Sequence, residues 1–425
     1  MRWIWQQSDW PGFRYDKRIF EARDIAFRIN SERLVGRFEA LPMAYQEDAT
    51  IDLMLSEAIK TSAIEGEALD RESVRSSLLS LITSDTLPET SDQKAAGAAS
   101  LLVDVRKNWR APLTHELLGK WQSMAVPDQR YTSIVCGAYR NDPSPMQIVS
   151  GPYGRERVHY VAPPATRVPD EMTKLLDWYN QSSPLNPDCP LGKIERTTPF
   201  VVSLSNHERP FDRLRANGFG PNGQSGLNPD QKILGIARAG IAHLWFEIIH
   251  PFDDGNGRVG RAIADHALSQ YLGYSTTACL ATAIEADKKS YYLQLEKASR
   301  GNLDINGWLD YFSDTVNQAQ EIAREKVDFV LAKTRFYEAY GGQMNERQAR
   351  MVSRVFAEGH KGFEGGITTR KYEAITKCPN RTASRDLSDL VAKGIIIPLP
   401  GGGRTTRYEL TTVEPGGFGL RKGWG

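Results

Sequence analysis

The stretch that most constrains the fold is a long apolar helix in the middle of the chain, at residues 228–250. Its residues 231–250, "QKILGIARAGIAHLWFEIIH", are too rich in hydrophobic residues to lie on a surface, so other elements must cover it. Asn228 followed by Pro229 predicts its N-terminus, and Pro251 stops it after His250. A chain built around such a helix is predicted to be mainly α-helical.

A short polar loop, "HPFDDGNGRVGR" at residues 250–261, joins this helix to a second one, predicted from about Arg258 to Leu272. Gly255 and Gly257 carry no Cβ, so the backbone near the start of the second helix can approach a ligand closely. A helix N-terminus presents unpaired N–H groups and a partial positive charge. The loop therefore predicts an anion cradle of the kind that binds phosphate.

Several side chains of the loop suit phosphate chemistry. Arg258 and Arg261 lie three residues apart on one helix face, where two guanidinium groups can clamp phosphates. Asp254 suits Mg²⁺, and His250 is the residue whose ordinary pKa suits proton transfer near neutrality. The competing interpretation is a polar turn with solvated charges. It leaves the gathering of so many chemically suited residues unexplained.

The loop resembles the signature of the Fic family, HxFx(D/E)GNGRxxR. Every defined position matches, at His250, Phe252, Asp254, Gly255, Asn256, Gly257, Arg258 and Arg261. The resemblance covers roughly residues 40–330, apart from one insertion. It implies a Fic-type helical core and a nucleotidyltransferase activity. Most such enzymes are protein adenylyltransferases, which move AMP from ATP to a protein hydroxyl group and release pyrophosphate.

The resemblance also implies a role for each matched residue. His250 would be the general base, Phe252 would anchor the loop in the core, and Asp254 would bind Mg²⁺. The phosphates would be held by Gly255, Asn256, Gly257, Arg258 and Arg261, with the two arginines gripping the β- and γ-phosphates. ATP is thus the expected substrate and Mg²⁺ the expected cofactor. Transfer from UTP, GTP or another phosphate donor is the alternative.

A second motif, "TSAIEG" at residues 61–66, closes a helix predicted at about 46–66. Thr61 and Glu65 lie four residues apart on one helix face, and Gly66 is a typical helix stop. The pattern resembles the inhibitory motif of the Fic family, (S/T)xxxE(G/N). The resemblance implies that Glu65 pairs with Arg261 and occupies the γ-phosphate site. A surface glutamate before a C-terminal glycine would give the same pattern.

A β-hairpin interrupts the helical pattern, with strands at 146–149 and 157–161 around a turn rich in Gly and Pro. It resembles the Fic flap, which pairs with the target backbone, here through Gln147, Ile148 and Val149. Gly137, Tyr139 and Arg140 precede it, as in many relatives. Further along the chain, Tyr291 or Tyr292 is expected beside the adenine base, and core packing explains these tyrosines equally well.

The predicted domains follow from these patterns. Residues 1–105 form an N-terminal helical region, and residues 106–335 form the catalytic core. An insertion at about 190–228 has no sustained period, is rich in Gly, Asn, Arg and Pro, and is predicted to be disordered. Its His207 and arginines allow a nucleic-acid patch as the less favoured interpretation. Because the insertion directly precedes the helix that carries His250, whether it impairs activity stays open.

The chain changes character at residues 341–412. Three helices and then two strands around a Gly-rich turn are the order of a small winged helix-turn-helix domain, and a flexible tail is predicted at 413–425. Residues 341–425 contain 14 Lys or Arg and 8 Asp or Glu, a net charge of +6. The expected DNA contacts are Arg381 and Arg385 on the third helix and Arg404 and Arg407 on the wing. Winged helices also dock proteins, so both uses stay open.

Composition sets further limits. Charged residues make up 25% and hydrophobic residues 40%, and the net charge of +1 gives the whole molecule no nucleic-acid or membrane signature. No apolar run approaches the roughly 20 residues of a membrane span, and the N-terminus lacks the layout of a signal peptide. We therefore expect a cytoplasmic protein. Its 4 cysteines lack CxxC spacing and are predicted to be reduced, buried thiols.

Together the resemblances imply an adenylyltransferase that modifies an unidentified target protein and itself, and that is held inactive by an internal glutamate. The alternative from another class is a DNA-binding regulator whose Fic core is quiescent or modifies only itself. A homodimer is compatible with the sequence, and no membrane partner is expected.

Overall fold

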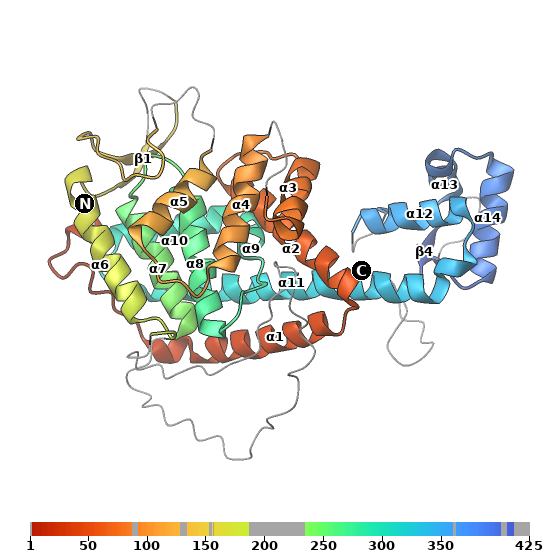
Figure 1. The fold of residues 1–425 in the computed structure, drawn as a ribbon, viewed down its shortest axis with the longest axis horizontal. Coiled ribbons are helices and arrows are strands. Elements are labelled where there is room, and N and C mark those ends of the chain that lie inside the picture. The colour runs from red at the N-terminus through yellow and green to blue at the C-terminus, as the bar shows by residue number, and fades with distance from the viewer. Residues whose placement is uncertain are drawn as a thin grey trace, which may run out of the picture. The chain divides into compact units, whose positions relative to one another are not determined.

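The computed structural model describes residues 2–86, 92–127, 134–152, 155, 157–186, 234–359, 363–400 and 406–411. In this part of the chain the protein is mainly helical, as predicted (Figure 1). The α-helices are α1 (Glu21–Glu39), α2 (Met43–Ile64), α3 (Arg71–Thr83), α4 (Gln93–Lys107), α5 (His115–Ala125), α6 (Val168–Gln181), α7 (Gly235–Ile249), α8 (Asn256–Leu272), α9 (Leu280–Ala286), α10 (Lys288–Arg300), α11 (Asn306–Tyr340), α12 (Glu346–Ala357), α13 (Thr369–Thr376) and α14 (Asn380–Ala392). The short 3₁₀ helices are η1 (Ile4–Gln6), η2 (Lys17–Ile19), η3 (Ala165–Arg167) and η6 (Gly341–Gln343).

The described residues also form two antiparallel hairpins. β1 (Gln147–Ser150) pairs with β2 (Arg157–Val161), with a register shift between Ile148 and Val149, and the hairpin lies where the sequence predicts one. β3 (Ile396–Pro398) pairs with β4 (Tyr408–Leu410). None of the helices in the described ranges has both the length and the apolar character that crossing a membrane requires.

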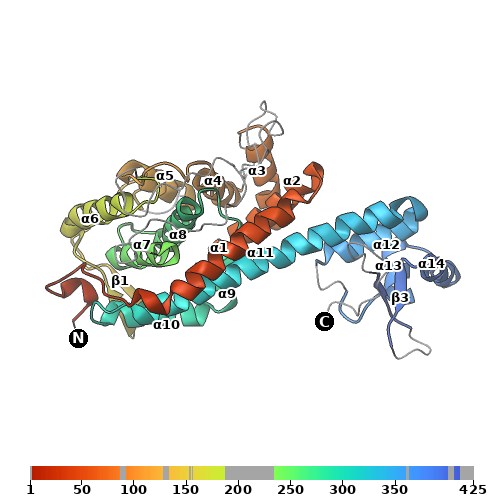
Figure 2. The ribbon, with the colours of Figure 1, turned by 90° about the horizontal axis from the view of Figure 1, so that it is seen from below.

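The chain divides into two compact units, residues 1–36 with 50–323, and residues 37–49 with 324–425. In the first unit, α7 and α8 pack against each other at the centre, with α4 and α5 beside α8 (Figure 1). Every residue of α7 except Glu247 is buried, as its apolar sequence requires. Figure 2 shows α1 lying along the first half of α11, where Arg23 of α1 forms an ion pair with Asp310 at 2.9 Å.

The start of α7 differs from the prediction. The helix begins at Gly235 after an extended Leu234, and not at Asn228 and Pro229, which lie outside the described residues. Its first turn is capped from a distance, because the Ile236 amide donates to Asp24 Oδ1 of α1 at 3.1 Å. A cap supplied by another element leaves no local signal. The predicted insertion at 190–228 falls outside the described residues as well.

In the second unit, α12, α13 and α14 precede the β3–β4 hairpin, in the order the sequence predicts. Asp386 of α14 is buried and joins the three helices, since it accepts hydrogen bonds from Arg347 of α12 at 2.8 Å and from the Tyr372 hydroxyl of α13 at 3.0 Å. The predicted tail at 413–425 lies outside the described residues.

The cysteines only partly follow the prediction of buried thiols. Cys279 is buried, whereas Cys136 and Cys378 are half-buried, and all three are reduced thiols. Both half-buried thiols lie in segments that connect regular elements, where packing is less complete than in the core. Cys189 lies outside the described residues.

Candidate active site

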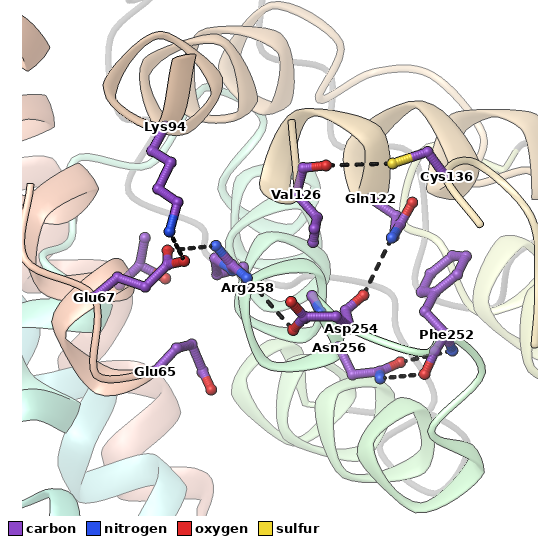
Figure 3. Close-up of polar contacts among 12 residues, drawn as sticks. Glu65, Glu67, Lys94, Gln122, Val126, Cys136, Phe252, Asp254, Asn256 and Arg258 are labelled. Carbon is purple, nitrogen blue, oxygen red and sulfur yellow. Dashed lines mark hydrogen bonds and ion pairs between the residues drawn. The ribbon is translucent and has the colours of Figure 1, made fainter. Parts of the chain in front are cut away.

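α7 ends at His250 in a strained turn that the following residues lock. His250 has a left-handed backbone (φ 50°, ψ 61°), which a non-glycine residue adopts rarely. The Phe252 ring is fully buried and lies 5.3 Å from the Tyr139 ring, so it anchors the loop. The Asn256 side chain accepts from the Phe252 amide at 2.9 Å and donates to the Phe252 carbonyl at 2.8 Å (Figure 3). Asn256 therefore shapes the loop from inside.

The N-terminus of α8 presents unpaired donors beside this loop. Gly255 precedes the helix with φ +87°, a conformation that favours glycine. Val259 donates the first intrahelical hydrogen bond, to the Gly255 carbonyl, so the amides of residues 256–258 have no acceptor within the helix. A Cβ on Gly257 would lie 2.2 Å from Glu65 Oε1. This glycine thus lets a carboxylate of the protein itself reach the predicted anion cradle.

His250 is set up as a neutral base. Its ring is half-buried, and Nδ1 is enclosed without a hydrogen-bond partner in the described part of the chain. Burial lowers the pKa of His250 to about 4, and the guanidinium of Arg140 acts in the same direction. The imidazole is therefore neutral near pH 7 and can accept a proton.

Arg140 holds the end of α7 in place. Its buried guanidinium donates to the carbonyls of His250 at 2.8 Å, Pro163 at 2.5 Å and Ile249 at 3.3 Å. A cation at the carbonyl end of a helix is favourable. In the sequence, Arg140 is noted only as a residue that precedes the predicted hairpin. Its contact with the His250 carbonyl is seen only in the structure.

Gln122 of α5 fixes the other side of the loop. This buried side chain donates to the Asp254 carbonyl at 3.2 Å and accepts from the Gly137 amide at 2.7 Å (Figure 3). Nothing in the sequence marks Gln122, because Asp254 lies 132 residues away.

Arg261 is buried and engaged by the end of α2. Its Nε donates to Thr61 Oγ1 at 2.8 Å, and its Nη2 donates to the Thr61 carbonyl at 3.0 Å and to Glu65 Oε1 at 2.8 Å. Burial alone would raise the pKa of Glu65, but Arg261 holds it below its ordinary value. Burial alone would likewise lower the pKa of Arg261, and Glu65 raises it instead. The two groups form an ionised pair, and the contact expected between Glu65 and Arg261 is present.

Arg258 meets a different carboxylate, that of Glu67. Its Nη1 donates to Glu67 Oε2 at 2.7 Å, and its Nη2 lies 3.5 Å from Asp254 Oδ1 (Figure 3). Nothing in the sequence motif marks Glu67. Across the described ranges, Arg258 Nε and Arg261 Nη1 are buried without a hydrogen-bond partner. Each arginine thus keeps a donor for a further anion.

Asp254 fits one part of a magnesium site. Its side chain is 48% exposed, and its Oδ1 accepts from the Gly255 amide at 2.6 Å. Mg²⁺ in phosphate-transfer sites commonly takes one or two protein carboxylates, and phosphate oxygens and water complete its shell. No group of three His, Cys, Asp or Glu residues that could hold a metal by themselves occurs in the portion of the chain described here.

The end of α2 is held in place by α10. Lys288 donates to the Ala63 carbonyl at 3.3 Å, and the Tyr292 hydroxyl donates to the Ile64 carbonyl at 3.1 Å. Tyr291 is 2% exposed, and its hydroxyl lies 2.9 Å from His243 Nε2, so in this structure it is a core residue. Of the two tyrosines expected beside adenine, only Tyr292 is exposed.

The middle of α2 is anchored on α9. Glu57 is buried, and its carboxylate accepts from the amides of Ala281 at 2.7 Å and Thr282 at 3.0 Å, which open α9. Lys60 forms an ion pair with Glu285 of α9 at 2.8 Å. Thr61, Glu65 and Gly66 therefore follow a firmly docked stretch of helix, and Gly66, with φ +83°, turns the chain away after it.

The hairpin of β1 and β2 has one occupied side and one open side. The Val161 carbonyl of β2 accepts from Trp5 Nε1 at 2.8 Å, and the Val158 carbonyl accepts from Arg300 at 3.1 Å. On β1, Gln147, Ile148 and Val149 are exposed. Among the described residues, no group outside the hairpin hydrogen-bonds to the backbone of these three. β1 therefore offers an edge to which another strand can add.

The arginines expected to touch DNA lie in the second unit. Arg381 and Arg385 are exposed and four residues apart on α14, and Arg407 is exposed just before β4. Arg404 lies outside the described residues.

Comparisons with known proteins point to the same loop. Residues 3–82 match a domain of unknown function, DUF4172. Residues 224–268 match the Fic/DOC family. This segment of the chain is similar to the Fic/DOC family. The matched segment holds α7, the loop and most of α8, and hence His250, Arg258 and Arg261.

The solved structures to which the chain is similar include three Fic proteins. The chain is similar to a Fic family protein from Desulfovibrio desulfuricans G20, with 18% identity, a TM-score of 0.44, and coverage of 94% of this chain and 97% of that chain. It is similar to a Fic domain containing signaling protein from Bacteroides thetaiotaomicron VPI-5482, with 16% identity, a TM-score of 0.45, and coverage of 70% and 97%. It is also similar to Fic-1 from C. elegans, with 17% identity, a TM-score of 0.44, and coverage of 72% and 73%.

Proposed function

We propose that this protein transfers AMP from ATP to a hydroxyl side chain of a target protein, and to itself, and that Glu65 holds it inactive. The observation that carries the proposal is the Glu65–Arg261 pair at the N-terminus of α8, where the carboxylate stands in for a phosphate group. Fic/DOC family proteins generally transfer a nucleoside monophosphate to protein targets, which agrees with this chemistry. ATP as donor also agrees with the cytoplasmic location expected from the sequence.

In the proposed reaction, the ATP phosphates bind at the N-terminus of α8. Arg258 and Arg261 grip the β- and γ-phosphates, and the amides of residues 256–258 face the charge that develops at the α-phosphate. The target hydroxyl oxygen attacks the α-phosphorus, and His250 Nε2 takes its proton. The bond to the β-phosphate oxygen breaks, and pyrophosphate leaves.

The metal fits this scheme through Asp254. The exposed carboxylate of Asp254 would hold Mg²⁺ together with phosphate oxygens. When bound, the ion would neutralise charge on the phosphates.

Glu65 inhibits in two ways in this proposal. Its carboxylate occupies the space above Gly257 that a phosphate would need, and it holds Arg261 through a buried ion pair. ATP then binds poorly, or binds with its α-phosphate misaligned for in-line attack. Small misplacements of reacting groups can cost about 10²-fold in rate.

The open edge of β1 is the proposed docking position for the target. An extended target segment would add to Gln147, Ile148 and Val149 as a third strand and present its hydroxyl to the loop. The contacts of Trp5 and Arg300 with β2 would keep the target segment from adding to the edge of β2.

The test is the change Glu65→Gly. It should free Arg261 and raise self-labelling from α-labelled ATP by about tenfold or more, since misalignment of this kind costs about 10²-fold. Labelling is measured by autoradiography of the purified full chain with Mg²⁺ and ATP at saturation.

Two further variants control this test. Glu65→Gly combined with Arg261→Ala should lose the gain, because the released arginine is what grips the phosphate. Glu65→Asp should be intermediate, because the shorter side chain reaches the guanidinium less well. If Glu65→Gly stays at the wild-type level, the inhibitory role of residues 61–66 is wrong.

A second candidate is a DNA-binding regulator whose Fic core is quiescent or modifies only itself. The exposed Arg381, Arg385 and Arg407 of the second unit favour it. The two candidates differ when Glu65→Gly is incubated with α-labelled ATP and a mixture of other proteins, because a core that is quiescent or modifies only itself adds no label to them.

A further inference from the structure

Glu67 forms a second ion pair with an arginine of α8. Its Oε2 accepts from Arg258 at 2.7 Å, and its Oε1 accepts from Lys94 of α4 at 3.0 Å (Figure 3). The Arg258 side chain is 7% exposed and that of Glu67 is 25% exposed. The pair is therefore shielded from water much better than an ordinary surface pair, and salt screens it less.

The backbone places Glu67 beside Glu65. Gly66 has φ +83°, and the Glu67 amide donates back to the Ser62 carbonyl at 3.0 Å. This turn at the end of α2 sends two carboxylates, two residues apart, to two different arginines of α8. Glu65 reaches Arg261, and Glu67 reaches Arg258.

We propose that Glu67 is a second inhibitory carboxylate, which occupies Arg258 as Glu65 occupies Arg261 and is itself held by Lys94. This inference rests on the proposed function, because it takes both arginines as the grip on the nucleotide phosphates. It adds a second step of regulation at the same site, because release of Glu65 alone frees Arg261 and leaves Arg258 bound to Glu67.

Lys94 allows the role of Glu67 to be tested without changing a residue of the proposed catalytic machinery. It lies near the start of α4, and its ammonium group contacts Glu67, not Arg258 or Arg261. It is not part of the proposed catalytic machinery. Removing its charge should loosen Glu67 without changing any group that would touch ATP. Exposed ion pairs contribute a factor of about 1.5 to 5 to an equilibrium, so the expected effect of Lys94→Met is of that size.

The experiment measures the dissociation constant of Mg-ATP by calorimetry on the full chain. The variants are Glu67→Gln, Lys94→Met, Glu65→Gly, and Glu65→Gly with Glu67→Gln. Glu67→Gln should tighten binding by about tenfold, as expected when a charge-assisted contact of about 1.4 kcal/mol no longer competes. Lys94→Met should act in the same direction by about 1.5 to 5-fold. The double variant should bind more tightly than Glu65→Gly alone.

Glu72→Gln is the matched control. Glu72 is exposed on α3, and its replacement removes the same charge from a position five residues further along the chain. It should leave the dissociation constant unchanged. A purely structural role for Glu67 would instead lower the melting temperature of Glu67→Gln and leave ATP affinity as it is, which would overturn the proposal.

The outcomes also separate this inference from the proposed function. If Glu65→Gly gains ATP binding and labelling while Glu67→Gln and Lys94→Met do not tighten binding, the second carboxylate is not inhibitory and the proposed function stands. If neither wild type nor any variant binds Mg-ATP, the arginines do not grip this nucleotide, and both proposals fall.

Discussion

At the scale of single residues, the candidate site depends on pairs. In each pair, the side chain of one residue fixes the backbone position of the other by hydrogen bonds. Arg140 contacts the His250 carbonyl at 2.8 Å and keeps a strained backbone in place, so the imidazole has a fixed position at the end of α7. Phe252 is held in the same way by Asn256, at 2.9 Å. These holding residues explain how a turn that most residues avoid persists in the native state.

The acid dependence of transfer should report on His250. The pKa is lowered from its ordinary 6.5 to about 4, so the neutral base persists well below pH 6 and is lost only as pH falls through about 4. We expect kcat/KM of Glu65→Gly to fall with an apparent pKa near 4, measured with α-labelled ATP at constant ionic strength.

His250→Ala in the same background is the control for this profile. It should lose about 10²–10⁴-fold in rate while ATP affinity changes little, because the base contacts the target hydroxyl and not the nucleotide. An acid limb near pH 6.5 would show that burial does not set this pKa. Undiminished turnover of the alanine variant would remove His250 from the role of base.

The chemistry of the loop could be predicted from sequence because its residues are contiguous. His250, Asp254, Arg258 and Arg261 lie within twelve positions, and a spacing of three or four residues on a helix already implies a shared face. The residues that control the loop could not be predicted in this way. Glu67 lies 191 residues from Arg258, and Arg140 lies 110 residues from His250, so only the folded chain brings them together.

At the scale of secondary-structure elements, the helix ends that carry a signal in the local sequence could be predicted. The helix ends without such a signal could not. Gly66 and Gly273 adopt positive φ just after α2 and α8, as glycine permits. The start of α7 has no such signal, because Asp24 of α1 caps it from a distance of 212 residues in the chain. The flap strands were predictable because turn residues separate two short runs of β-formers.

The third helix of the second unit should determine any binding to DNA. Replacing Arg381 and Arg385 together by Ala should weaken the binding of the full chain to duplex DNA at low salt. The salt slope should fall by about 0.9 for each DNA phosphate that an arginine no longer neutralises. Binding is followed by fluorescence anisotropy across a series of salt concentrations.

The paired control is Arg350→Ala with Arg354→Ala, which removes two exposed arginines from α12 instead. If the full chain does not bind duplex DNA even at low salt, the second unit is better interpreted as a protein-docking module. Equal weakening in both double variants would indicate a general charge effect without a contact surface on α14.

At the scale of the whole molecule, the core of the first unit should not need the insertion. Deleting residues 195–226 and joining the flanks should leave the melting temperature the same or higher, because a long loop contributes little beyond closure entropy. Thermal unfolding by circular dichroism measures this, with the undeleted chain as reference. The deletion should also keep the labelling gain of Glu65→Gly. A clear loss of cooperative unfolding would show that the segment packs against the core.

The anchoring of α2 on α9 limits how the proposed inhibition can end. Glu57 supplies the acceptors for the first amides of α9, so a departure of all of α2 would leave those amides, and a buried carboxylate, without partners. Only the turn beyond Lys60, with Thr61 and Glu65, can leave without breaking the contacts of Glu57 and Lys60 with α9. Relief of the proposed inhibition is then a local unfolding of one helical turn, which must break the buried pair of Glu65 with Arg261 and the contacts of Lys288 and Tyr292 with the end of α2.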